Sequence, residues 1–163
     1  MKFIKDIMKY IIIFIGIVVI LFSGLVLTSN IPKEKIVQNI QESVEFFKYK
    51  QGIHFQHFTR KDSIIHYYAD SMLLNIIYCI DSEKPIESTL WANYYQVEYI
   101  DRNDDFIEVV QQQKEPNTQY LRYWHGSMMI IRPLLLIFNI EQIYTLNRYN
   151  INSASHSIEY NAI

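Results

Sequence analysis

Hydrophobic and polar positions divide the chain sharply near residue 30. No charged residue occurs from Tyr10 to Pro32, and Ile11 to Leu27 is almost entirely aliphatic or Phe. A helix of about 20 apolar residues crosses a hydrocarbon core of about 30 Å, and it pairs its own backbone groups there. The pattern therefore predicts a transmembrane helix at residues 10–29, preceded by a short segment at residues 1–9.

A cleaved signal peptide is the alternative for this run, because the basic segment MKFIKDIMK precedes it. The run exceeds the roughly 7–15 residues of a signal-peptide core, and LVLTSNIP contains no A-x-A-like cleavage site. We therefore expect a retained anchor. The lysines of residues 1–9 and the free amine outnumber Lys33 and Lys35. The positive-inside rule then places the N-terminus in the cytoplasm and the bulk of the chain outside the cell membrane.

Two helices are predicted to begin at prolines. Pro32 suits the first turn of an amphipathic helix that ends near Gly52. Its apolar positions recur at helical spacing, namely Ile36, Ile40, Val44 and Phe47. We expect this helix against the extracytoplasmic region or along the membrane surface. Ser82 and Pro85 favour another helix through PIESTLWANYYQVEY.

Between them, DSIIHYYADSMLLNIIYCID predicts a helix that Asp62 or Ser63 can cap. Its apolar stripe would consist of Ile64, Ile65, Tyr68, Met72, Ile76 and Ile80. Asp70, Ser71 and Asn75 lie mostly off that stripe, so we expect them on the polar face.

The most polar segment is IDRNDDFIEVVQQQKEPNTQ. Asp101, Asn103 and Asp105 match the opening of a calcium-binding loop, but Phe106 and Gln112 stand where that loop needs Gly and Glu. We therefore predict a solvated loop with a short helix. The pair His54 and His57 has no third ligand at a matching interval, so no metal site and no cofactor are predicted.

The segment YLRYWHGSMMIIRPLLLIFNI, residues 120–140, combines an apolar run with Arg132 and Pro133. From Ser127 to Ile140 a helix reaches only about 20 Å, too short to cross a membrane unaided. We predict a second apolar helix at residues 127–140, interfacial or incompletely transmembrane, followed by a polar tail at residues 141–163.

An unpaired Arg132 would cost several kcal/mol at the bilayer centre. We therefore expect its side chain to point towards headgroups, or towards the polar face of the helix that carries Asp70. Trp124, His125 and Gly126 are expected at the outer interface, because the Trp ring is apolar and its N–H needs a polar partner.

These elements predict an all-α fold: a transmembrane helix, an extracytoplasmic helical region at residues 30–126 and a short membrane-associated helix. The 163 residues allow one modest domain. Half of the residues are hydrophobic and 15% are aromatic, which excludes a disordered chain. The net charge of −2 gives no reason to expect a nucleic-acid partner. The single cysteine, Cys79, cannot form an internal disulfide.

The segments IPKEKIVQNIQESVEFF, YYADSMLLNI and YLRYWHGSMMIIRPLLLIFN together resemble the N-terminal part of an uncharacterised multi-pass membrane protein family of Gram-positive bacteria. The resemblance covers most of residues 1–147 and carries no biochemical function. It implies further spans after Asn147, where this chain continues instead into an Asn- and Ser-rich tail. The chain is therefore expected to be a truncated form.

The layout also resembles the GT-C glycosyltransferases, which act on lipid-linked sugars. By position, this resemblance implies Asp70 and His125 as catalytic candidates. It implies Arg122 and Arg132 as ligands of a lipid phosphate. A carboxylate can act as base for an acceptor hydroxyl, and Arg can bind a phosphate bidentately. The chain lacks the paired-acid motif of that group and most of its spans.

Two functions therefore remain open. The first is a membrane protein with a helical extracytoplasmic domain and no catalytic motif. The second is the N-terminal fragment of a GT-C-like transferase, so the sequence leaves open whether the chain belongs to an enzyme. In both, membrane lipid is the expected partner, and other membrane subunits are possible.

Overall fold

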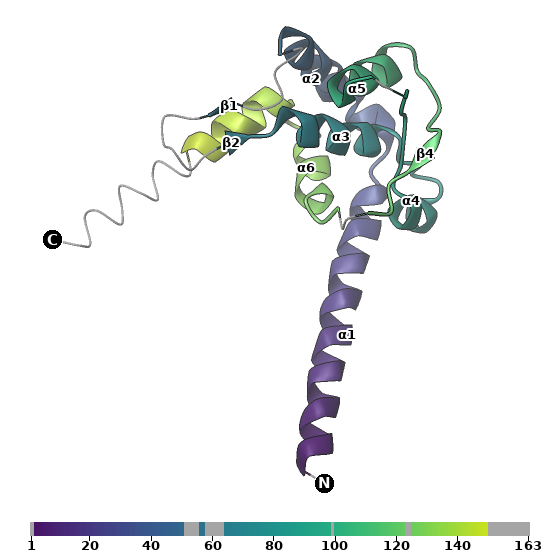
Figure 1. The fold of residues 1–163 in the computed structure, drawn as a ribbon, viewed down its shortest axis with the longest axis vertical. Helices are drawn as coiled ribbons and strands as arrows, with labels where there is room; N and C mark the ends of the chain where they lie inside the picture. The colour runs from purple at the N-terminus through teal and green to yellow at the C-terminus, as the bar shows by residue number, and fades with distance from the viewer. Residues whose placement is uncertain (1, 51–55, 58–63, 99, 123–124, 150–163) are drawn as a thin grey trace, which may run out of the picture.

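In the computed structural model, a long helix projects from a compact group of shorter helices (Figure 1). The structure describes residues 2–50, 56–57, 64–98, 100–122 and 125–149. Strands within these ranges form only two antiparallel ladders of two residues each, β1–β2 and β3–β4. The predicted all-α fold is confirmed.

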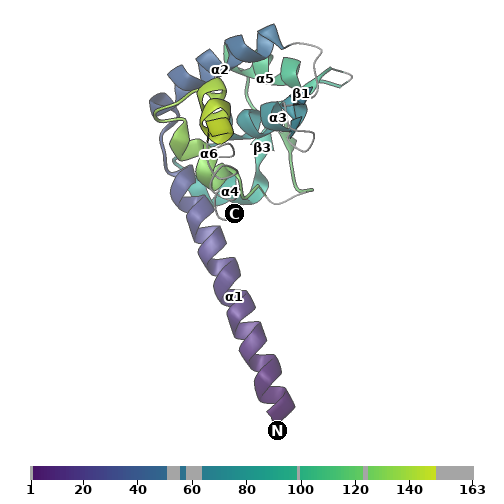
Figure 2. The same cartoon turned by 90° about the vertical axis from the view of Figure 1, so that its left-hand side faces the viewer.

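The projecting helix α1 (Lys2–Ser29) includes the predicted span. Its apolar side chains from Ile7 to Leu21 are exposed, and the first buried residues are Leu25 and Ser29. The part from Lys5 to Ser29 is long and apolar enough to cross a membrane, and no other helix of the described ranges is. Only the last turns of α1 are covered by the rest of the protein (Figure 2).

The remaining elements follow in a fixed order along the chain. They are η1 (Lys33–Lys35), α2 (Val37–Tyr49), β1 (Gln56–His57), β2 (Ile64–Ile65), α3 (Tyr67–Tyr78), α4 (Pro85–Trp91), β3 (Asn93–Tyr94), α5 (Arg102–Gln111), β4 (Thr118–Gln119) and α6 (Met128–Leu134). Residues 140–149 form a further helical stretch, which the prediction of a polar tail did not include. Residues 150–163 of that tail lie outside the described residues.

The core forms where α2, α3 and α5 pack together. The predicted stripe of α2 is buried in it: Ile36, Ile40, Val44 and Phe47. The rings of Phe47 and Phe106 meet edge to face at 5.6 Å between centroids, a favoured geometry for aromatic pairs. Helix α2 therefore packs against the rest of the domain, which was one of the two expected places.

Helix α3 departs from its prediction in its start and in part of its buried face, although Ile76 and Ile80 of the predicted stripe are buried. It begins at Tyr67, whereas the proposed caps at 62 and 63 lie outside the described residues. Tyr68 is exposed, and Ser71 and Asn75 are fully buried. The reason is that Asn75 Nδ2 donates to Tyr95 O at 2.8 Å while Asn75 Oδ1 accepts from Tyr95 N at 3.0 Å. A polar side chain can be buried when such bonds satisfy it.

Helix α4 is shorter than predicted. It ends at Trp91, and Ala92 follows with a left-handed backbone at φ 43°. A residue in this conformation stops a helix and redirects the chain. The next two residues form β3, which pairs with β4.

The segment predicted as solvated contributes α5 to the core, with Phe106, Val109 and Val110 buried. Its polar residues have structural partners. Asp101 caps the helix by accepting from Asn103 N at 2.8 Å. Asp105 is fully buried, accepting from Val97 N at 2.9 Å and from Arg102 Nη1 at 2.7 Å. The predicted short helix is present, and residues 112–115 after it are exposed. The expectation that residues 101–110 are solvated is wrong.

Candidate functional site

The residues singled out by sequence fall into separate environments. Asp70 lies on α3 and bonds to the helical stretch 140–149, whereas Arg132 is buried in α6. Arg122 and His125 line a groove beside α1. Among the described residues, Asp70 forms no hydrogen bond or ion pair with any of the other three.

Asp70 lies in the first turn of α3 beside an aromatic cluster. Tyr144 Oη donates to Asp70 Oδ2 at 2.7 Å. The rings of Phe46 and Tyr67 lie 5.8 and 6.2 Å from the ring of Tyr144. Burial raises the pKa of the Asp70 carboxyl, although the Tyr144 hydroxyl and His66 oppose this shift. The carboxyl thus has a partner from its own chain.

Replacing Asp70 with Asn is expected to stabilise the protein at neutral pH. A carboxyl whose pKa is raised on folding favours the folded state when protonated, and this contribution is lost as pH rises through the folded pKa. Asn keeps an acceptor for Tyr144 and carries no charge. The melting temperature of Asp70→Asn should exceed that of wild type at pH 7–8, and the difference should vanish near pH 3. A lower melting temperature at both pH values would show that the charge stabilises the fold.

Arg132 is fully buried, although its side chain is charged. Nη1 donates to Ile77 O at 2.5 Å and Nη2 donates to Ile31 O at 2.6 Å. Ile77 lies in the last turn of α3, and Ile31 lies just beyond α1. Carbonyls at helix C-termini lack intrahelical donors and carry partial negative charge, so a guanidinium satisfies them well. Burial lowers the pKa of Arg132 to about 10, which leaves it charged at neutral pH.

Arg132 therefore points neither to headgroups nor to Asp70, contrary to the sequence prediction. The carbonyls that end two helices supply the partners that a buried charge needs. Its Nε has no partner among the described residues. This residue holds α1, α3 and α6 together and is not available to a lipid phosphate.

A groove of about 310 Å³ lies where α1 meets α4, residues 120–122 and residues 125–128. We call it the α1–α4 groove. Its apolar lining comes from Phe22, Leu25, Leu90, Ala92, Leu121 and Met128. Its polar lining comes from Thr89, Tyr120, Arg122 and His125. This is the place where the structure brings two of the predicted site residues together.

The polar residues of the α1–α4 groove differ in their availability. His125 lies against Tyr120, with 4.8 Å between ring centroids and 3.2 Å from Nε2 to Tyr120 O. Burial lowers the pKa of His125, so the ring is neutral at neutral pH. Thr89 Oγ1 donates to Pro85 O at 2.7 Å and lies 3.0 Å from Ser29 Oγ. Arg122 is exposed and pairs with no carboxylate of the described residues.

Trp124, expected at the outer interface, lies outside the described residues. His125 and Gly126 are half-buried beside the end of α1. The contributions of Phe22 and Leu25 were missed, since nothing in an apolar run marks which residues face a domain. Tyr144 was also missed, because it lies in the predicted polar tail.

A second hollow of about 500 Å³ surrounds Tyr78 and Cys79. Its charged lining mixes both signs: Lys33, Lys84, Lys114, Glu34, Asp81, Glu83, Glu87 and Glu115. Lys33 Nζ lies 4.1 Å from the centre of the Tyr78 ring. Burial raises the pKa of Cys79 to about 12, so its thiol is not a nucleophile at neutral pH.

The described part of the chain contains no set of metal ligands. No group of three His, Cys, Asp or Glu residues lies close enough there to hold an ion. His54 of the H-x-x-H pair lies outside the described residues. The α1–α4 groove, with its apolar walls and one available cation, is therefore the candidate site. Comparisons with known protein families, with curated proteins and with solved structures find no match to this chain.

Proposed function

We propose that the chain is a membrane-anchored protein whose helical domain is seated on the outer surface of the cell membrane. The observation that carries this proposal is the exposure of α1. Its apolar side chains from Tyr10 to Leu21 contact almost nothing else in the protein. An apolar surface of this length is unfavourable in water and fits the hydrocarbon core of a bilayer.

Packing at the C-terminal end of α1 supports a retained anchor over a cleaved signal peptide. Leu25 belongs to the core, and Ser29 Oγ lies 3.0 Å from Thr89 Oγ1. Met129 reaches within 2.2 Å of the point where Gly24 would carry a Cβ. Cleavage near Ser29 would remove these contacts from the domain. The domain and the span therefore act as one unit.

The transferase alternative needs Asp70 and Arg132 to face a lipid-linked sugar. Asp70 bonds to Tyr144, and Arg132 is buried against two backbone carbonyls. Helix α6 is about 10 Å long, too short to form a second span. No observation on the described residues favours the transferase, and we propose the non-catalytic anchored domain.

Membrane insertion and orientation can be tested together in intact spheroplasts. The full chain should resist extraction by alkaline carbonate. External protease should digest residues beyond Ser29 and spare a tag placed before Met1, because the lysines of residues 1–9 favour the cytoplasmic side.

Combined replacement of Lys2, Lys5 and Lys9 with Gln should make the orientation less uniform, which provides the matched control. Recovery of a soluble form that starts near Ser29 would contradict the proposal. Protection of the domain from external protease would reverse the orientation.

A further inference from the structure

We propose that the α1–α4 groove binds a phospholipid of the outer leaflet, with an acyl chain against its apolar wall and the phosphate on Arg122. This inference rests on the proposed membrane anchoring. It adds a ligand class and a binding site to it.

The level of the groove in the membrane follows from the length of α1. Lys5 and Asp6 are charged and stay outside the hydrocarbon core, and Lys9, one turn further on, extends its ammonium group back to the cytoplasmic headgroups. A core of about 30 Å that begins just after Asp6 extends about 20 residues of helix, to the neighbourhood of Leu27. Phe22 and Leu25 then lie within the outer leaflet. The groove that they line opens at the boundary between hydrocarbon and headgroups.

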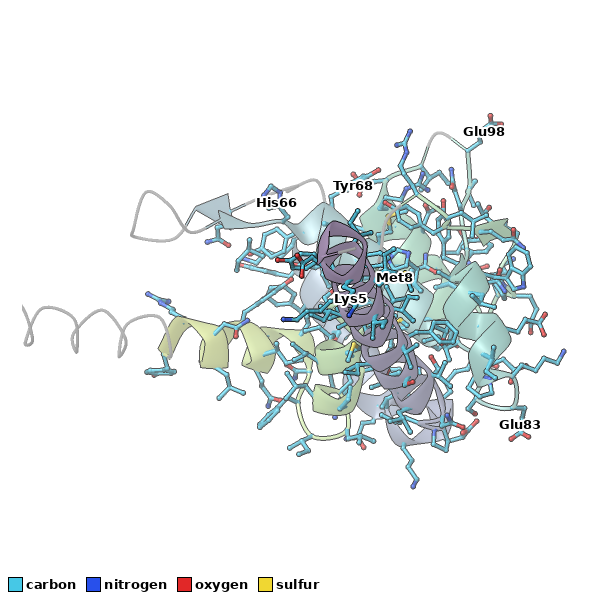
Figure 3. All side chains as sticks on the ribbon, turned by 90° about the horizontal axis from the view of Figure 1, so that it is seen from below. Lys5, Met8, His66, Tyr68, Glu83 and Glu98 are labelled. Carbon is cyan, nitrogen blue, oxygen red and sulfur yellow. The ribbon has the colours of Figure 1, made fainter. Side chains whose placement is uncertain are left out.

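The domain presents apolar side chains at this same end. Leu90 and Leu121 line the groove and are 56% and 63% exposed. Seen along α1 from the end that carries Lys5 and Met8, the domain spreads sideways from the helix (Figure 3). The face of the domain that surrounds α1, where the helix leaves it, can therefore rest on the bilayer. Exposed leucines there gain by contact with acyl chains.

The positive charge of Arg122 favours a lipid headgroup that carries a phosphate. Arg122 is exposed at the rim of the groove, and its guanidinium can bind a phosphate through two parallel hydrogen bonds. His125 is neutral and bonded to Tyr120 O, so it shapes the groove and adds no charge. A volume of about 310 Å³ accommodates part of one lipid. The membrane that holds α1 supplies this ligand at high local concentration.

The first test measures phospholipid that remains bound to the full chain after mild detergent extraction, by native mass spectrometry. Vesicles of phosphatidylcholine with phosphatidylglycerol supply the lipid. Arg122→Gln should weaken retention of phosphatidylglycerol roughly tenfold, the order expected for a charge-assisted bidentate contact. Arg122→Lys should retain most of the binding.

Lys114→Gln, which removes an exposed charge from the second hollow, should leave retention unchanged. Equal retention by wild type and Arg122→Gln would overturn the proposal. Displacement of the lipid by excess inorganic phosphate would also overturn it, by identifying a site for free phosphate.

The second test measures depth with a spin label on the full chain in nanodiscs. A label at Leu121→Cys should be relaxed by oxygen more than by a water-soluble agent. Helix α5 lies on the side of the domain away from the projecting part of α1 (Figure 1). A label at Gln112→Cys, the exposed residue that follows α5, should show the reverse. Both labels are placed in a Cys79→Ser background, because Cys79 is half-buried and lines the second hollow.

Water access at position 121 in protein that still resists carbonate extraction would overturn the lipid site and leave the anchoring proposal intact. Extraction of the protein by carbonate would overturn both. Spin–spin coupling between labels at position 121 would show that a second copy of the chain covers the groove, and would also overturn the lipid site.

Discussion

Replacing Arg132 with Met is expected to lower the free energy of unfolding of the domain by about 3 kcal/mol. The guanidinium is the donor to Ile77 O and Ile31 O. In a continuing helix, the backbone N–H of Asp81, four residues after Ile77, would donate to Ile77 O. It donates instead to Ser88 Oγ at 3.1 Å. Met fills similar space but leaves both buried carbonyls without that donor.

The loss can be measured as a shift of the urea midpoint in nanodiscs, read from the reaction of Cys79 with a fluorogenic maleimide. Burial raises the pKa of the half-buried Cys79 thiol to about 12 in the folded domain, which slows its reaction, and unfolding restores an ordinary thiol. Arg132→Lys should show a smaller loss, because an ammonium keeps the charge without the planar fork. A midpoint for Arg132→Met equal to that of wild type would indicate a side chain that points to headgroups, as sequence had suggested.

Sequence predicted the parts of the fold that depend on local pattern. The span within α1 and the stripe of α2 were found because many consecutive apolar positions repeat one signal. The buried face of α3 was found only in part: Ile76 is buried as expected, but Asn75 is buried too, since its partner Tyr95 lies 20 residues away. The early end of α4 was not found either, because β3 pairs with a strand at Thr118–Gln119.

The candidate site was predictable only in part, for the same physical reason. Arg122 and His125 were identified, and both line the α1–α4 groove. Arg132 was identified as unusual, but its partners are 55 and 101 residues away in sequence. An arginine in an apolar run shows that a partner is needed and does not show which one. Helix-terminal carbonyls, which any residue type can supply, leave no mark in the sequence.

Replacing Phe106 with Ala should cost about 3–5 kcal/mol of unfolding free energy, the range for truncating a buried Phe. Its side chain is fully buried and meets Phe47 edge to face. The polar residues around it had indicated a solvated loop, in which this change would be almost neutral. They are polar because Asp101 caps α5 and Asp105 fixes Val97, and this fixed backbone holds Phe106 in the core.

The matched control is Ile100→Ala in the same segment, where the side chain is 41% exposed. Its cost should stay within about 0.5 kcal/mol, as for other surface substitutions. Both variants can be compared by the urea midpoint of Cys79 exposure in nanodiscs. If α5 packs in the core, Phe106→Ala should lose much more unfolding free energy than Ile100→Ala. Equal small losses would restore the solvated segment and remove α5 from the core.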